Sequence, residues 1–193
     1  FTVEFYGASQ RVTVPTVGIH NVYDALAAFA VGYEMRMEPQ KIAAGLKSFV
    51  PSGMRQRIKK VGGITVIEDC YNASPDSQKA ALDVLSSFKS NRRIAVLGDM
   101  LELGKYSDVS HENVGKYTEN KNIDILFTYG EKAKHIAEGA KGFVDEIKSF
   151  DDKTELVKAL LETLKDGDAV LFKASRGMKL EDVINSLYRE WEE

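Results

Sequence analysis

Short apolar runs alternate with helical patterns along the chain from about residue 60 to its end. The strand-like runs lie at 64–69, 94–98, 125–128, 146–150 and 169–173. The helical patterns that follow them lie at 76–87, 110–119, 132–140, 153–164 and 180–191. Such alternation is typical of a parallel sheet that helices cover on both faces. The sequence therefore predicts an α/β fold with a Rossmann-like, mostly parallel sheet.

The first fifty residues follow another pattern. Residues 3–6 and 12–14 are predicted to form two short strands joined by a loop at 7–10. Val22, Leu26, Phe29 and Tyr33 recur at helical spacing, and a second helix is expected to begin at Pro39. This part is too small to bury its apolar faces alone. We expect a boundary near Pro51-Ser52-Gly53, and hence one domain piece at 1–52 and a full domain at 53–193.

Composition excludes several classes of protein. The net charge of −3 and the scattered basic residues predict neither a nucleic-acid partner nor a membrane surface. The pairs Lys59-Lys60 and Arg92-Arg93 are short enough to be assigned to solvated turns. The single cysteine, Cys70, cannot form an internal disulfide, no zinc-ligand spacing occurs, and a small buried thiol is expected there. With no long apolar span, we expect a cytoplasmic monomer.

The segment E-D-C-Y-N-A-S-P-D-S, residues 68–77, joins the first of these strands to its helix. In open α/β sheets, ligands bind beyond the carboxyl ends of the strands. Asp69 lies at such an end, where a carboxylate can accept hydrogen bonds from sugar hydroxyls. Spacing alone favours a structural interpretation for the rest of the segment, with Ser74 as the helix N-cap and Pro75 at the first helical position.

Four segments, in order, resemble the Mur ligases, which build the peptide stem of bacterial cell-wall precursors. They are G-I-H-N-V-Y-D-A-L-A-A at 18–28, D-C-Y-N-A-S-P-D-S at 69–77, L-G-D-M-L-E-L-G at 97–104 and K-A-S-R-G-M at 173–178. Each motif alone is modest, whereas four in order over essentially the whole chain are specific. Within the family, the wording is most similar to the branch that adds D-alanyl-D-alanine to UDP-N-acetylmuramoyl-tripeptide in peptidoglycan biosynthesis.

The resemblance implies an ATP-dependent amide ligase that also uses Mg²⁺. The 193 residues contain no G-x-x-x-x-G-K-[ST] loop to hold a triphosphate. The family's phosphate loop, magnesium ligands and modified lysine precede the His-Asn helix, so we assign no catalytic residue and no metal ligand here. We therefore expect a carboxyl-terminal fragment, inactive alone, that joins the tail of the central ATP-binding domain to the Mur ligase carboxyl-terminal domain.

The family match also assigns residues to the nucleotide. His20 and Asn21 match the motif that recognises adenine, although both would otherwise be read as helix caps. Asp24 departs from the family's second asparagine, and a carboxylate cannot donate unless it is protonated. Arg55 matches the hinge arginine near the phosphates, with an exposed linker arginine as the alternative. Asp69 matches the acid that binds the ribose hydroxyls.

A second group is assigned to the peptide substrates and the cleft. It comprises Asn72, Ser74, Ser77, Asp99, Lys173, Ser175 and Arg176. Asp99, with Glu102, either orients the incoming amine or lies on a solvated loop. The cations of Lys173 and Arg176 suit the carboxylate of the dipeptide. The alternative is that both residues simply lie on a turn before a helix, without a role in binding. For His111 we expect a capping or core role.

Two other functions remain open. The first is a sister Mur ligase or a folylpolyglutamate synthase, which share the architecture. The second is a free-standing α/β binding module without catalysis.

Overall fold

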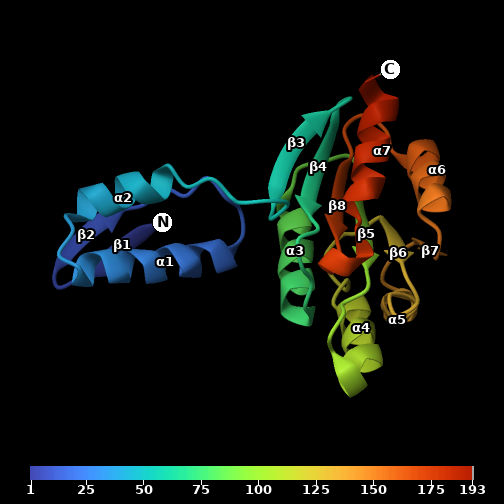
Figure 1. The fold of residues 1–193 in the computed structure, drawn as a ribbon, viewed down its shortest axis with the longest axis horizontal. Helices are drawn as coiled ribbons and strands as arrows, with labels where there is room; N and C mark the ends of the chain where they lie inside the picture. Colours follow the sequence, from blue (N-terminus) through green and yellow to red (C-terminus); the bar gives the residue numbers. More distant parts are fainter. Residues whose placement is uncertain (193) are drawn as a thin grey trace. The chain divides into compact units, whose positions relative to one another are not determined.

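The computed structural model describes residues 1–192, which form two compact units. The first unit is Phe1–Ser52, and the second begins at Gly53. The second unit is built on one six-stranded sheet, whose strands are labelled in Figure 1.

The sheet has the strand order β3-β4-β8-β5-β6-β7. Their bounds are β3 Arg57–Val61, β4 Ile64–Asp69, β8 Ala169–Lys173, β5 Arg93–Gly98, β6 Ile125–Tyr129 and β7 Glu146–Phe150. Only the edge pair β3 and β4 is antiparallel, while every other pair in this sheet is parallel. The predicted mostly parallel α/β sheet is confirmed.

Helices cover both faces of this sheet. They are α3 Pro75–Ser87, α4 Ser107–Lys116, α5 Lys134–Gly139, α6 Lys153–Thr163 and α7 Glu181–Glu192. Helices α6 and α7 pack on the face that presents Val96, Phe127 and Phe172, and Tyr188 and Trp191 of α7 pack against this core. The intervening side chains, such as Leu97 and Leu126, are equally buried, and α3 and α5 contact the sheet there. Burial on both faces explains why the inner strands β5, β6 and β8 are almost continuously apolar.

Strand β8 lies between β4 and β5, although it comes last in sequence. The chain leaves β4 through α3, skips one position to form β5, and adds β6 and β7 outward. It then returns through α6 and fills the gap with β8. The topology therefore switches direction around β8, and in open α/β sheets ligands bind at such a point. Lys173 on β8 pairs in register with Asp69 on β4 and with Leu97 on β5.

The first unit is a hairpin with two helices. Strands β1 Thr2–Phe5 and β2 Ala8–Arg11 pair antiparallel, and helices α1 Ile19–Glu34 and α2 Pro39–Lys47 follow. The expected second strand at 12–14 and the expected loop at 7–10 are wrong. Tyr6 and Gly7 both have positive φ, 45° and 79°, and so form a two-residue turn whose twist suits a tight hairpin. Val12 instead joins the small core with Val3, Phe29 and Ile42.

Two predictions in the second unit are also wrong. Neither basic pair lies on a solvated turn: Arg93 begins β5 and Arg92 is ion-paired with the buried Asp168, while Lys59-Lys60 lies within strand β3. Its charges suit an edge strand, because Lys59 reaches the fully buried carboxylate of Glu68 at 2.9 Å. Helix α4 begins at Ser107 and ends at Lys116, about a turn earlier than predicted, and the short 3₁₀ turn η1, Gly104–Tyr106, leads into it.

Candidate functional site

The carboxyl ends of β4 and β8 are joined by an ion pair. The Lys173 ammonium lies 2.7 Å from Oδ2 of Asp69 and donates a second hydrogen bond to the Asn72 carbonyl at 3.0 Å. The side chain of Lys173 is 3% exposed and that of Asp69 is 13% exposed. The other Asp69 oxygen, Oδ1, accepts from the backbone amide of Gln56 at 3.3 Å. The pair neutralises Asp69, while its carboxylate keeps a partly open side.

Cys70 follows Asp69 and points into the sheet core. Its thiol is buried and donates to the Phe172 carbonyl. Burial, helped by the neighbouring Asp69 charge, raises the pKa of the Cys70 thiol far above its ordinary value. The expected small buried thiol is confirmed, and it stays protonated at neutral pH.

Ser175 connects three loops at this edge. Its hydroxyl donates to the Ala73 carbonyl at 3.4 Å and accepts from the Leu101 amide at 2.9 Å, while its own amide donates to the Asp99 carbonyl at 3.0 Å. Ser175 is only 3% exposed. The structure therefore gives this residue a role in fixing the loops, and its contact with a substrate remains a prediction.

Asp99 lies beyond the end of β5 and is largely buried. Its Oδ1 accepts from the Ala133 amide at 2.7 Å, one residue before α5 begins. Gly130 leaves room for this carboxylate, since a Cβ there would lie 2.5 Å from Oδ1. Asp99 thus holds the start of α5, so the expected alternative of a wholly solvated loop is wrong for it, whereas Glu102 is exposed.

The N-terminus of α3 is capped by side chains of its own first turn. Ser74 is the N-cap, Pro75 occupies the first turn, and the Ser74 and Ser77 side chains bond reciprocally to each other's backbone amides. The predicted N-cap at Ser74 is confirmed, and the reciprocal bond from Ser77 makes it a capping box. Asn72 accepts from the Ala73 amide at 2.9 Å and remains exposed. Roles of Asn72, Ser74 and Ser77 in substrate binding stay predictions.

Tyr71 brings two distant arginines together, which the sequence did not predict. The guanidinium carbon of Arg55 lies 3.8 Å from the Tyr71 ring centroid, and that of Arg176 lies 5.1 Å from it. Arginine stacks on aromatic rings through cation–π attraction. All three residues are exposed, so two positive charges meet solvent beside the ion pair of Asp69. The signal available in the sequence was an aromatic residue two positions after the end of β4.

Gln78 is a second residue that sequence reasoning missed. It is fully buried in the first turns of α3, and its amide donates to the Gly98 carbonyl at 2.9 Å. This bond ties α3 to the end of β5.

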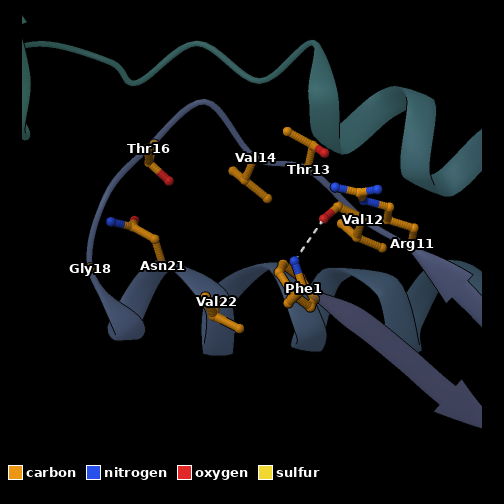
Figure 2. A pocket seen from close by; sticks show the side chains of 9 residues that line it. All are labelled: Phe1, Arg11, Val12, Thr13, Val14, Thr16, Gly18, Asn21 and Val22. Atoms are coloured by element: carbon orange, nitrogen blue, oxygen red, sulfur yellow. Dashed lines mark hydrogen bonds between the residues drawn. The ribbon is translucent and has the colours of Figure 1, made fainter.

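In the first unit, Asn21 lines a pocket of about 240 Å³. Figure 2 shows Asn21 near the start of α1, opposite the loop that carries Thr16. Asn21 donates to the Val17 carbonyl at 2.7 Å and lies 3.1 Å from the His20 ring nitrogen. Gly18, rather than Asn21, is the N-cap of α1. The adenine roles of His20 and Asn21 remain predictions.

Within residues 1–192, no group of three or more histidine, cysteine, aspartate or glutamate side chains is arranged to hold a metal ion. No helix in the same range has the length and apolarity that a membrane span requires.

The family model described as "Mur ligase, glutamate ligase domain" matches residues 54–176, which is more than half of the chain. The chain belongs to this Mur ligase family. The matched range contains the sheet edge with Arg55, Asp69, Lys173 and Arg176.

Curated relatives and solved structures agree with this assignment. The UDP-N-acetylmuramoyl-tripeptide–D-alanyl-D-alanine ligase of Bacillus subtilis is 41% identical over 97% of this chain and 41% of its own length. A crystal structure of MurF from Acinetobacter baumannii matches with a TM-score of 0.88 and 27% identity, over 98% of this chain and 42% of that one. MurF from Thermotoga maritima, solved in complex with ADP, matches with a TM-score of 0.84 and 25% identity, over 99% and 43%. The chain thus spans about two fifths of the length of these relatives.

Proposed function

We propose that this chain is the carboxyl-terminal part of an ATP-dependent ligase that adds D-alanyl-D-alanine to UDP-N-acetylmuramoyl-tripeptide in the cytoplasm. The observation that carries the proposal lies at the carboxyl ends of β4 and β8. There the Asp69–Lys173 pair lies beside the arginines stacked on Tyr71. The similarity of nearly the whole chain to a ligase of this activity supports it over a non-catalytic binding module.

The nucleotide is assigned to Asp69, Arg55, His20 and Asn21. The carboxylate of Asp69, which Lys173 orients at 2.7 Å, accepts hydrogen bonds from the two ribose hydroxyls of ATP. Arg55 supplies positive charge for the phosphates, and the amide of Asn21 offers the donor and acceptor that an adenine edge requires. The Mg²⁺ ligands and the phosphate loop are assigned to the central domain of the ligase, whose tail would be residues 1–52.

The dipeptide is assigned to the other side of the same edge. Two of the three Lys173 donors are already used, by Asp69 and by the Asn72 carbonyl. Arg176 is exposed on the neighbouring loop, so it is the better partner for the dipeptide carboxylate. Asn72, Ser74, Ser77, Asp99 and Ser175 would border this substrate or fix the loops around it.

The proposed reaction has two steps. The terminal carboxylate of the tripeptide attacks the γ-phosphorus of ATP, which forms an acyl phosphate and releases ADP. The amine of D-alanyl-D-alanine then attacks the acyl carbon, an amide forms, and phosphate and a proton leave. This chain contributes positioning and charge, on which such transfers depend.

Asp69→Asn, made in the ligase that carries this chain, tests the nucleotide role. A hydrogen bond to a charged acceptor contributes about 1.5–3 kcal/mol, so the KM for ATP should rise by about tenfold or more. Asp168→Asn is the matched control, because Asp168 is an equally ion-paired carboxylate that precedes β8 at the opposite edge of the sheet. An unchanged KM for ATP in folded Asp69→Asn would remove Asp69 from the nucleotide site.

The 193-residue chain alone should neither hydrolyse ATP nor ligate, because it contains no phosphate loop. Phosphate release by the purified chain that required both the tripeptide and the dipeptide would contradict the assignment of the phosphate loop to the central domain.

A further inference from the structure

The loop between β5 and η1 is held by two side chains from other elements. The Met100 amide donates to Nε2 of His111 on α4 at 2.9 Å. The next amide, that of Leu101, donates to the Ser175 hydroxyl at 2.9 Å. Two consecutive backbone donors of residues 99–103 are therefore satisfied by side chains, and one of these side chains is titratable.

The partners of His111 fix its protonation state. Its Nδ1 lies 2.7 Å from the Ser107 carbonyl, which only accepts hydrogen bonds, while its Nε2 faces the Met100 amide, which only donates. The ring must therefore carry its proton on Nδ1 and remain neutral. His111 is fully buried, so the expected core role is confirmed and neither contact is exchanged easily for water.

The loop that His111 holds displays functional candidates in an uncommon backbone conformation. Glu102 is exposed and has a φ of 67°, the left-handed region that residues with a side chain rarely adopt. Asp99 holds the start of α5 from the same loop. Such a conformation persists only where the surroundings enforce it, and the bonds from His111 and Ser175 do so here.

We propose that His111 is a positioning residue whose neutral imidazole holds the Met100 amide, and that protonation of Nε2 releases the loop carrying Asp99 and Glu102. An imidazolium has no acceptor at Nε2 and places a second donor against the Met100 amide. The proposal deepens the proposed function, because Asp99 and Glu102 are the candidates for orienting the incoming amine.

The surroundings of His111 make this protonation unfavourable. Burial is the largest influence and lowers its pKa below the ordinary value of 6.5, and the positive charge that His135 on α5 can carry acts in the same direction. The hydrogen bond to the Ser107 carbonyl opposes this most, followed by Asp99 and Asp108, although Asp108 is itself paired with Lys132 at 3.0 Å. Because the folded-state pKa of His111 is depressed, His111 is neutral above pH 6.5 and holds the loop there. The loop is released as the pH falls below 6.5 and through the lower folded-state pKa.

Long-range ¹H–¹⁵N spectra of the histidine rings in the 193-residue chain test the geometry without any activity. We expect His111 to show the Nδ1–H tautomer and to titrate below 6.5, with the Met100 amide shift following the same curve. An Nε2–H tautomer, or a Met100 amide that does not follow the titration of His111, would overturn the proposal.

Two variants separate positioning from packing. In His111→Gln the side-chain oxygen can replace Nε2 as an acceptor but cannot be protonated, whereas the shorter side chain of His111→Asn does not reach Met100. We expect His111→Gln to keep the Met100 amide protected from hydrogen exchange. This protection should not weaken over the pH range in which His111 of the wild type becomes protonated. We expect His111→Asn to lose about tenfold in that protection, the upper range for one hydrogen bond. Equal protection in the two variants would refute the role of the Nε2 acceptor.

Steady-state kinetics in the ligase that carries this chain provide the functional test. Below pH 6.5 the KM for the amine substrate should rise more in the wild type than in His111→Gln, a comparison that cancels the protonation of the amine itself. Parallel pH profiles would overturn the role in the reaction. A wild type without ligase activity would instead refute the proposed function, and the spectra would still decide whether His111 holds the loop.

Discussion

Lys173 and Asp69 occupy paired positions on neighbouring parallel strands, and their charged groups lie 2.7 Å apart at the edge where the topology switches. The lysine is almost completely buried, so this carboxylate compensates the cost of removing its ammonium from water. One contact therefore joins the strand before the segment 68–77 to the last strand of the sheet. It also fixes the position of the carboxylate that we assign to the ribose.

Lys173→Met should destabilise the second unit by about 3 kcal/mol, because it leaves the carboxylate of Asp69 largely buried without its cation. The double variant Lys173→Met with Asp69→Asn should regain a large part of that loss, since no unpaired charge remains. Urea unfolding of the wild type, both single variants and the double variant gives the coupling energy. Additive losses would show that the pair does not act as a unit.

Burial, rather than distance, should decide the contribution of an ion pair in this chain. Arg92–Asp168 and Lys134–Asp151 both span 2.6 Å, but Asp168 is fully buried whereas both side chains of the second pair are about half exposed. Arg92→Gln should destabilise the protein by about 3 kcal/mol, because Asp168 would remain buried and uncompensated. The control Lys134→Gln should leave the urea midpoint nearly unchanged. Similar shifts for the two variants would contradict this reasoning.

Gly115 should be required by the packing of α4 on α5. A Cβ at this position would lie 2.1 Å from the Ile136 carbonyl oxygen, a backbone atom that cannot rotate away. Gly115→Ala should therefore destabilise α4, although alanine favours helices by about 1 kcal/mol over glycine. Gly45→Ala in α2 is the control, because a Cβ there meets no atom within 4 Å.

Amide hydrogen exchange in each helix measures both effects. We expect protection to fall in α4 of Gly115→Ala and to rise in α2 of Gly45→Ala. A gain in both helices would mean that α4 and α5 can separate at little cost.

Tyr71 should matter through its ring rather than its hydroxyl. Tyr71→Leu removes the face on which Arg55 and Arg176 stack, a contact of about 0.5–1 kcal/mol at exposed sites. In the ligase that carries this chain, the KM for D-alanyl-D-alanine should rise roughly two- to fivefold. Tyr71→Phe keeps the ring and should behave as the wild type.

Arg176→Lys in the same assay identifies the arginine responsible. It keeps the charge but not the paired hydrogen bonds to a carboxylate. A rise in KM with the dipeptide varied supports the assignment, a rise only with ATP varied moves Arg176 to the nucleotide side, and no change removes it from the site.

Local chemistry in the sequence determined much of the second unit. The apolar runs were long enough to require burial on both faces, so the parallel sheet and its alternating helices followed from composition and period. The N-cap at Ser74 and the buried thiol of Cys70 depend on near neighbours, and both were predicted correctly. Four motifs in order were sufficient to indicate the family. Strand β3 was not predicted, because most of its residues are charged. These charges are tolerated at the edge of the sheet, where Lys59 pairs with the buried Glu68 of the neighbouring strand.

Tertiary structure decided which of these residues act together. Lys173 and Asp69 are 104 positions apart, and nothing local shows that β8 inserts beside β4. The stacking of Arg55 and Arg176 on Tyr71, the three loops joined by Ser175, and the tautomer of His111 also depend on contacts between distant segments. Sequence periodicity indicates which residues of each element are buried. Hydrogen bonds and ion pairs, in contrast, form only between groups that the completed sheet brings within about 3 Å.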